Sequence, residues 1–451
     1  MFSAALARRA TEGKPVRVGI IGAGKFGGGL LVQLAQMKGM AVCAVAAKDL
    51  ERARTALLAS GAPAGSIQLV ESAGAMAAAI HRGKCAITQD GLLVAGAEPV
   101  EVVVEATGLP EAGARLAYEA IQQGKHVVMV NVEADVTVGP LLRRLADRAG
   151  VVYTLVDGDQ PGVIMNLIEW ARTLGFEVVA AGRGTLLYAD DREGTPDTVP
   201  QRFGFDAETL ARRSINLKMF NSFRDGTKSQ VEMTALANMA GLVPDVQGMH
   251  EPAANIRDLA RIFSRREEGG ILGRHGVVEL ANSVAEEDGR TLLDDPLKMG
   301  VFVVIRAEHP FIQEDLQNYY LHSGGDGHNF LLYRPYHLVA VEAPISIAKA
   351  ALYGQPTGAP LPTPMAEVIT VAKRDLKQGE ALDGSGGYTV YGLCERAEVA
   401  RVRQYLPLGL ADRVRLTQPV RRGEPITYGM VELAEDSFVL KLRRLQDAVV
   451  W

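Results

Sequence analysis

A glycine pattern at residues 22–27, GAGKFG, constrains this chain more than any other feature. It follows an apolar run at 16–21, VRVGII, that is typical of a buried strand, and a helical segment comes next. In that context the G-x-G-x-x-G spacing predicts a dinucleotide site: the first glycine permits a tight turn, the second lets the backbone approach a pyrophosphate, and the third allows close helix–strand packing. The N–H groups at the start of the helix attract the phosphate charge. The loop residues assigned to the cofactor are Gly22, Gly24, Lys25, Phe26 and Gly27.

Apolar runs alternate with helical segments through the first third of the chain. The further runs lie at 41–47, 101–108, 125–131 and 151–156, and one of the helical segments between them is 140–150. Strands that alternate with helices of ten or more residues indicate a doubly wound parallel sheet. We therefore predict an α/β protein in which residues 1–160 form an NAD(P)-binding Rossmann domain.

The middle of the chain, 161–355, mixes strand and helix patterns and is predicted to be an α+β catalytic domain. The expected strands are 176–184, 216–223, 301–308 and 330–342, and the expected helices are 161–174 and 344–354. Four prolines within 355–364 indicate a linker or an extended crossing segment.

The C-terminal region, 356–451, contains a short internal repeat. VAKRDLKQGEALD at 371–383 is similar to LTQPVRRGEPIT at 416–427, since each has a basic turn, Gly-Glu and then an apolar residue. Two such half-repeats predict a small β-rich module. The pattern resembles the SAF domain, which occurs in sialic acid synthases, antifreeze proteins and pilus or flagellar assembly proteins.

The end of the second strand bears on the choice of cofactor. NAD enzymes usually place an acid there to bind the ribose 2′-hydroxyl, but this strand ends in small residues followed by Lys48. The small residues leave room for a 2′-phosphate that Lys48 and Arg52 would neutralise, while Asp49, one step later, is placed to face the ribose. We expect NADP(H), with NAD(H) as the alternative. The assigned residues here are Ala47, Lys48 and Arg52.

The next two strand ends supply the remaining cofactor candidates and the first catalytic one. After the strand in 101–108, the turn Ala106-Thr107-Gly108 is suited to pass under the nicotinamide ribose. The strand in 125–131 ends at Asn131, and Glu133 follows. Ligands of open α/β sheets bind at the carboxyl ends of the strands, so Glu133 is either catalytic or the first acid of the next helix.

Several of these stretches resemble known families. The first third resembles dehydrogenases of the homoserine dehydrogenase and glucose–fructose oxidoreductase type, although their Thr-Ala-Asn-Lys motif reads here MVNVE (129–133). Over almost the whole chain, VNVEADVTVGP, GDQP, VEMTALANMAGLVPDVQGMHEP, RPYHLVAVE and the SAF-like end resemble a reductoisomerase-like family. Some of its members convert 1-deoxy-D-xylulose 5-phosphate to 2-C-methyl-D-erythritol 4-phosphate. The resemblance implies a homodimer, and 161–355 would then also supply the dimer contacts.

The chain departs from that family's pattern at two places. GDQPG (158–162) and GRGT (182–185) stand where the family has Gly-Asp-Glu-Pro-Ser and Gly-Lys-Gly-Lys, so a different substrate is an open alternative. Reductive isomerisation needs an anion clamp, proton transfer and polarisation of two oxygens, for which Mg²⁺ or Mn²⁺ is a possible aid.

The candidates outside the cofactor loop are acids, basic residues and histidines at turns and element ends. Asp159 is either catalytic or the N-cap of the helix at 161–174, and Glu232 is either catalytic or a solvated helix face. His337 and His250 are proton-transfer candidates or ordinary core histidines. The catalytic candidates are Glu133, Asp159, Lys228, Glu232 and His337. The substrate-binding candidates are Asn131, Gln160, Arg183, Asn238, His250 and Arg334. His322, Asp326 and His328 lie in a glycine-rich loop and are candidate metal ligands. Their spacing fits no helical pair of ligands and gives no clear set of three, so we do not assign a metal site to them.

Composition and charge exclude several classes of function. A net charge of −5 argues against a general affinity for nucleic acid or an anionic membrane, and the three cysteines give no disulfide framework. The absence of a signal-like or spanning apolar stretch makes a cytoplasmic protein the expectation. Three hypotheses remain: an NADPH-dependent reductase or reductoisomerase of a small hydroxylated, phosphorylated carbonyl compound, a homoserine-dehydrogenase-type enzyme, or a nicotinamide or metabolite sensor.

Overall fold

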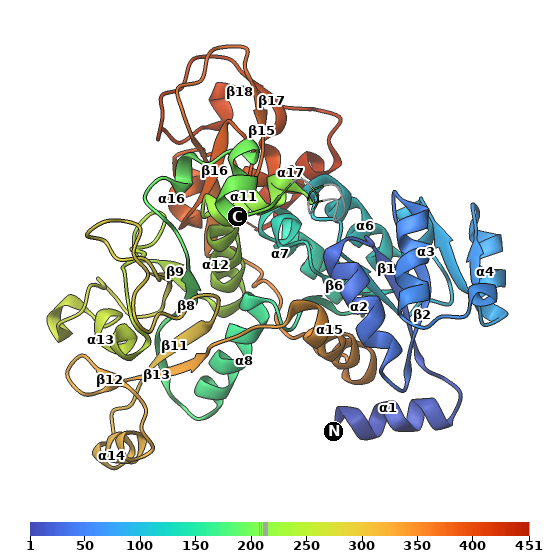
Figure 1. Ribbon diagram of the computed structural model, residues 1–451, viewed down its shortest axis with the longest axis horizontal. Coiled ribbons are helices and arrows are strands. Elements are labelled where there is room, and N and C mark those ends of the chain that lie inside the picture. Colours follow the sequence, from blue (N-terminus) through green and yellow to red (C-terminus); the bar gives the residue numbers. More distant parts are fainter. Residues whose placement is uncertain (207, 209, 211–214, 451) are drawn as a thin grey trace. The chain divides into compact units, whose positions relative to one another are not determined.

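The computed structural model describes residues 1–206, 208, 210 and 215–450 (Figure 1). The chain forms two compact units. Unit 1 consists of residues 1–162, 338–363 and those from 437 onward, and unit 2 consists of residues 163–337 and 364–436. The domain boundaries at 160 and 355 stay a prediction.

Unit 1 contains a seven-stranded sheet in the order β3-β4-β2-β1-β5-β6-β7. Every neighbouring pair in it is parallel, which confirms the doubly wound α/β prediction. The strands are β1 (Val16–Ile21), β2 (Met40–Ala46), β3 (Ile67–Leu69), β4 (Cys85–Thr88), β5 (Val102–Glu105), β6 (His126–Met129) and β7 (Tyr153–Leu155).

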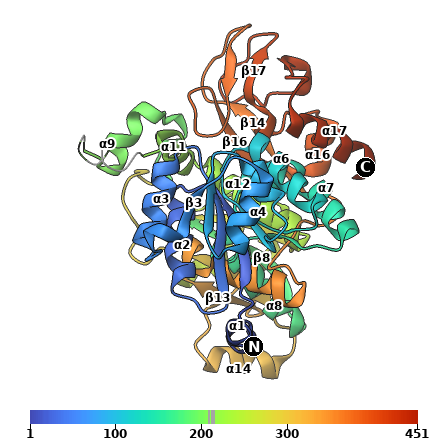
Figure 2. The same ribbon diagram turned by 90° about the vertical axis from the view of Figure 1, so that its right-hand side faces the viewer.

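Helices cover both faces of this sheet, with α2 and α3 on one side and α6 and α7 on the other (Figure 2). Leu30 of α2 and Ile347 of α15 are fully buried against the apolar face of the sheet, and this burial drives the packing. The helices of this part are α1 (Phe2–Thr11), α2 (Lys25–Ala35), α3 (Leu50–Ala59), α4 (Ala73–His81), α5 (Gly91–Ala95), α6 (Pro110–Gln122), α7 (Val132–Ala149), α15 (Val339–Ala348) and α17 (Phe438–Val450). Helix α8 (Gln160–Thr173) begins in unit 1 and continues into unit 2.

Unit 2 is built on a mixed six-stranded sheet in the order β12-β13-β11-β8-β10-β9. Its central strand β8 is parallel to β10 and antiparallel to β11. The strands are β8 (Glu177–Thr185), β9 (Val243–Pro244), β10 (Val277–Asn282), β11 (Val301–Arg306), β12 (Ser323–Gly324) and β13 (Asn329–Arg334). The helices are α9 (Val199–Phe203), α11 (Leu217–Arg224), α12 (Thr227–Ala240), α13 (Leu259–Ile262) and α14 (Pro310–Asn318).

The C-terminal part of unit 2 is β-rich, as predicted. Strands β14 (Ala366–Ala372) and β16 (Val390–Arg396) pair beside α16 (Ala397–Val402). Strands β15 (Ala381–Asp383), β17 (Asp412–Leu416) and β18 (Val431–Glu432) form a second antiparallel sheet. The two half-repeats bond to each other symmetrically: the N–H of Gly379 donates to the carbonyl of Leu416 (2.8 Å), and that of Gly423 to the carbonyl of Ala372 (2.9 Å). The resemblance to the SAF domain stays a prediction.

Three sequence-based elements need correction. The strand expected at 216–223 is helix α11, which the side chain of Asn216 caps by accepting from the N–H of Met219 (3.1 Å). The strand expected at 330–342 ends at Arg334, because Pro335 has no N–H for the ladder, and α15 begins soon after. Helix α7 begins at Val132 rather than near 140.

One further finding concerns helix length and polarity. Within the part of the chain that the structure describes, no helix has the length and apolar character that crossing a bilayer requires.

Candidate functional site

The glycine loop of unit 1 has the geometry that a dinucleotide requires. Gly22 has φ +108°, and a Cβ atom there would lie 2.5 Å from the carbonyl oxygen of Ala106. A Cβ on Gly27 would lie 1.9 Å from the carbonyl oxygen of Gly22, so only glycine lets α2 pack this closely on the turn. Gly24, the N-cap of α2, faces open space. The loop therefore leaves room for a pyrophosphate at the helix N-terminus.

Replacing Gly24 by Ala is expected to weaken NADPH binding by about tenfold or more while costing under about 1 kcal/mol of stability. The new Cβ would meet no protein atom within 4 Å, so the fold tolerates it, but it would occupy the space that the pyrophosphate needs. Fluorescence titration and thermal unfolding measure the two effects. Gly27→Ala is the contrast, since it should lose stability as well as binding. Unchanged NADPH affinity in Gly24→Ala would contradict the assignment.

The end of β2 carries no free acid of the kind that NAD enzymes use. The carboxylate of Asp49 caps α3 by accepting from the N–H of Arg52 (3.0 Å), which commits that oxygen to the helix. Lys48 is exposed, and its carbonyl accepts from the side chain of Gln89 (3.0 Å). The choice between NADP(H) and NAD(H) stays a prediction.

The ends of β5 and β6 lie side by side and share a hydrogen-bonded cluster. Asn131 caps α7 with its oxygen, while its nitrogen donates to Thr107 (3.3 Å) and to the carbonyl of Leu109 (3.0 Å). Glu105 accepts from the N–H of Thr107 (2.9 Å) and is completely buried. Glu133 is half-buried in the first turn of α7, so it is a helix-opening acid as well as an acid at a strand end.

The segment that follows β7 also lies at the carboxyl ends of the strands of unit 1. Asp159 directly precedes α8 and accepts from the N–H of Gln160 (3.1 Å), and both residues are buried. Asp157, two residues earlier, pairs with Lys349 (3.3 Å). The carboxyl ends of β1, β5, β6 and β7 thus bring the predicted residues of the first region to one edge of the sheet.

The most organised acid–base pair of unit 2 joins His250 to Glu279 of β10. One carboxylate oxygen accepts from the backbone N–H of His250 (3.0 Å), and the other lies 2.6 Å from its Nδ1 atom. Glu279 is completely buried, whereas Nε2 of His250 has no hydrogen-bond partner among the described residues and lies 3.7 Å from Asp245. The hydrogen bond with Glu279 raises the pKa of His250, and burial raises the pKa of Glu279. A carboxylate that fixes an imidazole in this way prepares it for proton transfer.

The backbone around His250 is strained, and its neighbour belongs to a second ion pair. Met249 and Glu251 have φ values of +67° and +51°, a region that non-glycine residues rarely adopt and that is found at functional sites. Glu251 pairs with Arg192 (2.7 Å) and accepts from Thr185 (3.3 Å). Burial raises the pKa of Glu251 despite Arg192.

A third pair in unit 2 joins Arg183 of β8 to Glu232 of α12. Both side chains are almost completely buried. The alternative that Glu232 lies on a solvated helix face is therefore wrong. The carboxylate of Glu232 balances the charge of Arg183. Glu279 pairs in register with Gly182, the residue before Arg183, so this pair and the histidine pair lie on opposite faces of the sheet.

The remaining predicted residues of unit 2 are spread over several elements. Arg334 is the last residue of β13 and pairs with Val301 of β11, and its guanidinium lies over the ring of Tyr336 (4.3 Å). Nδ1 of His337 is 2.9 Å from the carbonyl oxygen of Met299. Lys228 is half-buried in the first turn of α12. The side-chain oxygen of Asn238 accepts from the N–H groups of Met365 (2.7 Å) and Ala366 (2.9 Å), so it ties β14 to α12.

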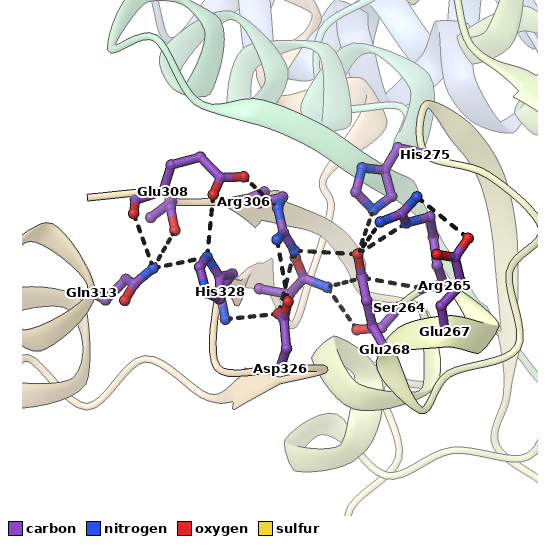
Figure 3. Close-up of polar contacts among 12 residues, drawn as sticks. Ser264, Arg265, Glu267, Glu268, His275, Arg306, Glu308, Gln313, Asp326 and His328 are labelled. Carbon is purple, nitrogen blue, oxygen red and sulfur yellow. Dashed lines mark hydrogen bonds and ion pairs between the residues drawn. The ribbon is translucent and has the colours of Figure 1, made fainter. Parts of the chain in front are cut away.

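The glycine-rich loop 322–328 belongs to a network of ion pairs (Figure 3). Asp326 pairs with Arg306 (3.2 Å), and Arg306 also contacts Glu268 (3.4 Å). His328 lies 2.9 Å from the side-chain nitrogen of Gln313. Among the described residues, no group of three or more His, Cys, Asp and Glu side chains is arranged to hold a metal ion.

Among the acids of these clusters that were not assigned from the sequence are Glu105, Glu251 and Glu279. Glu279 interrupts an apolar strand, VVELAN, and Glu105 ends another, VVVE; an acid within or directly after such a run is the signal that marks a buried acid. Glu251 has no comparable signal, because its partners come from distant parts of the sequence.

Two models of known protein families match different parts of the chain. Residues 22–155 match the NAD binding domain of homoserine dehydrogenase, and residues 158–343 match the catalytic domain of oxidoreductase DRL. No curated protein matches the chain. The matched domains make the protein an oxidoreductase with a nicotinamide-binding domain.

Three of the solved structures that match this chain have named activities. A homoserine dehydrogenase from Thiobacillus denitrificans is 18% identical with a TM-score of 0.42, and the match covers 91% of this chain and 98% of that one. DOX-P reductoisomerase in complex with magnesium is 14% identical with a TM-score of 0.31, covering 48% and 56%. A myo-inositol dehydrogenase from Lactobacillus casei is 15% identical with a TM-score of 0.28, covering 41% and 50%. At these values they carry no argument about the reaction.

Proposed function

We propose that this nicotinamide-binding oxidoreductase uses NADPH to reduce a small hydroxylated carbonyl compound. Reductive isomerisation of a phosphorylated hydroxyketone such as 1-deoxy-D-xylulose 5-phosphate is the first reaction of this class to test. The observation that carries the proposal is the His250–Glu279 pair inside the segment that matches an oxidoreductase catalytic domain.

Carbonyl reduction needs a hydride at carbon and a proton at oxygen. Bound NADPH would supply the hydride, and Gly22, Gly24 and the start of α2 would hold its pyrophosphate. The chain must supply the proton. His250 carries it at Nε2, because Glu279 engages Nδ1 and stabilises the positively charged ring. In a reductoisomerase the same groups would move protons during the carbon-skeleton rearrangement before reduction.

The basic residues suit an anionic substrate to different degrees. Arg183 is buried and balanced by Glu232, so a phosphate would have to compete with that carboxylate. Arg334 and Lys228 are only half-buried and are better placed to reach a substrate group. A divalent metal and a homodimer remain part of the proposal, to be checked by metal dependence and by light scattering.

Lys48→Ala is expected to weaken NADPH binding by about tenfold or more, because hydrogen bonds to charged groups contribute about 1.5–3 kcal/mol. NADH, which has no 2′-phosphate, should bind equally well to both proteins. Isothermal titration of each cofactor measures the difference. The exposed Arg82, beside Gln68, provides a matched charge-removal control in Arg82→Ala. Tighter binding of NADH than of NADPH to the unaltered protein would contradict the cofactor proposal.

The function is tested by following NADPH oxidation with paired substrates. The panel contains phosphorylated hydroxyketones, their unphosphorylated counterparts and homoserine-type acids, each with and without Mg²⁺ or Mn²⁺. Oxidation that needs the phosphate supports the proposal. Turnover only with a free amino or hydroxy acid supports the dehydrogenase alternative, and tight NADPH binding without turnover supports the sensor.

A further inference from the structure

The carboxyl group of Glu105 is enclosed at the end of β5, beneath the turn 106–108. One oxygen accepts from the N–H of Thr107 (2.9 Å), and the other has no hydrogen-bond partner among the described residues. A Cβ atom on Gly113 of α6 would lie 2.9 Å from that second oxygen, so α6 is packed directly on the carboxyl group. The mechanism proposed above makes no use of this acid.

This carboxyl group lies on the nicotinamide side of the sheet. The adenosine end of a dinucleotide contacts the end of β2, and the molecule crosses the sheet at the switch point beside β1. Its nicotinamide end must therefore extend over β5 and β6, where Glu105 and Asn131 end their strands. The turn after Glu105 also abuts the glycine loop, since a Cβ on Gly22 would meet the carbonyl oxygen of Ala106.

The surroundings leave the charge of Glu105 uncompensated. Burial raises its pKa to about 7, the hydrogen bond from Thr107 opposes that rise, and the charge of Glu133 adds to it. A buried acid with such a pKa is partly protonated at neutral pH and responds to any new charge nearby. The other ionisable groups on the elements around it are Arg17 of β1, Lys25 of α2, Glu111, Arg115, Tyr118 and Glu119 of α6, Asp135, Arg143, Arg144, Asp147 and Arg148 of α7, Tyr153 of β7, and Lys125 and His126 at the far end of β6.

We propose that Glu105 determines how the protein distinguishes the two oxidation states of its nicotinamide cofactor. The oxidised ring carries a positive charge and the reduced ring is neutral, whereas the phosphates are the same in both. Ionised Glu105 therefore favours the oxidised form, and protonated Glu105 does not. Binding of the oxidised cofactor releases a proton from Glu105, and protonation of Glu105 promotes its departure. The inference rests on nicotinamide binding at the glycine loop and is independent of the substrate proposed above.

The sign of the effect follows from linkage. A cation near Glu105 lowers its pKa in the complex, so affinity for NADP⁺ is low when the acid is protonated in both states and high when it is ionised in both. A shift of one pKa unit corresponds to a tenfold change in affinity. We expect NADP⁺ to bind about tenfold more tightly at pH 8.5 than at pH 5.5, after correction for the 2′-phosphate by reference to NADPH. The affinity for NADPH should change with pH only through the ionisation of the 2′-phosphate, which both cofactors carry.

Isothermal titration of both cofactors across this pH range, on the full chain, is the test. Glu105→Gln mimics the protonated acid, so it should remove the difference in pH dependence between NADP⁺ and NADPH. Glu98→Gln, at an 80% exposed side chain beyond the other end of β5, should retain it. Equal pH dependence of the two cofactors in the unaltered protein, or a difference that survives in Glu105→Gln, overturns the proposal.

Proton release in the unaltered protein gives a second measurement that does not depend on the variant folding. Titrations at pH 7 in buffers of different ionisation enthalpy count the protons released on binding. With a pKa of about 7 in the free protein, the expected tenfold change in affinity corresponds to release of about 0.4 proton more with NADP⁺ than with NADPH. Equal release with the two cofactors overturns the proposal even if a substrate is found, and failure of the substrate panel leaves this measurement decisive.

Discussion

His250→Gln is expected to lower kcat by about 10²–10⁴-fold, the usual contribution of a positioned proton donor. The affinity for NADPH should be unchanged, since His250 is assigned to proton transfer and is not among the residues assigned to the cofactor. Steady-state kinetics with the substrate found in the panel, together with cofactor titration, separates the two effects. His81→Gln, at a 61% exposed histidine, is the control and should retain full activity. A kcat in His250→Gln within threefold of the unaltered enzyme would remove this residue from the mechanism.

Glu279→Gln tests the pair from its other side. Its hydrogen bond is the largest cause of the raised pKa of His250, so the neutral amide should lower that pKa. A proton donor is active while protonated, and the activity of the variant should therefore decline at lower pH than that of the unaltered enzyme. The pair also contributes stability below the ordinary histidine pKa of 6.5, which is lost as the pH rises through the raised folded value. A pH–rate profile with an unmoved alkaline limb would contradict this role.

Glu232→Ala is expected to destabilise the protein by about 3–5 kcal/mol, because it leaves the guanidinium of Arg183 buried without its carboxylate. Urea unfolding measures the loss. The matched control is Glu308→Ala, which removes the 70% exposed partner of Arg306 and should cost under about 1 kcal/mol.

The double variant Arg183→Met, Glu232→Leu separates a structural role from a catalytic one. Apolar residues of similar volume remove both buried charges, so most of the lost stability should return. If the double variant is stable and also turns over substrate, the pair is structural. If Glu232→Ala unfolds like the unaltered protein yet loses activity, the prediction of a structural pair is wrong and the earlier assignment of Glu232 as catalytic is favoured.

The glycine loop shows how far local sequence can predict structure. The turn at Gly22 and the packing at Gly27 depend on residues adjacent in the chain, and the parallel sheet follows from the alternation of apolar runs and helices. The prediction of a strand at 216–223 was wrong because, over so short a stretch, the spacing of the apolar residues is compatible with both the helical and the strand period. The cap by Asn216, and contacts with the rest of unit 2, select the helix there.

By itself the sequence determined the parallel sheet of unit 1, the nicotinamide-binding loop and the β-rich repeat near the C-terminus, since each depends on neighbours or on a repeating pattern. Only the tertiary structure decided which charges meet. His250 and Glu279 lie on separate segments, Arg183 and Glu232 come from a strand and a helix, and Glu105 is enclosed by α6 and Asn131. Burial and partner choice depend on contacts between distant segments, and those contacts turn ordinary acids and bases into candidate catalytic groups.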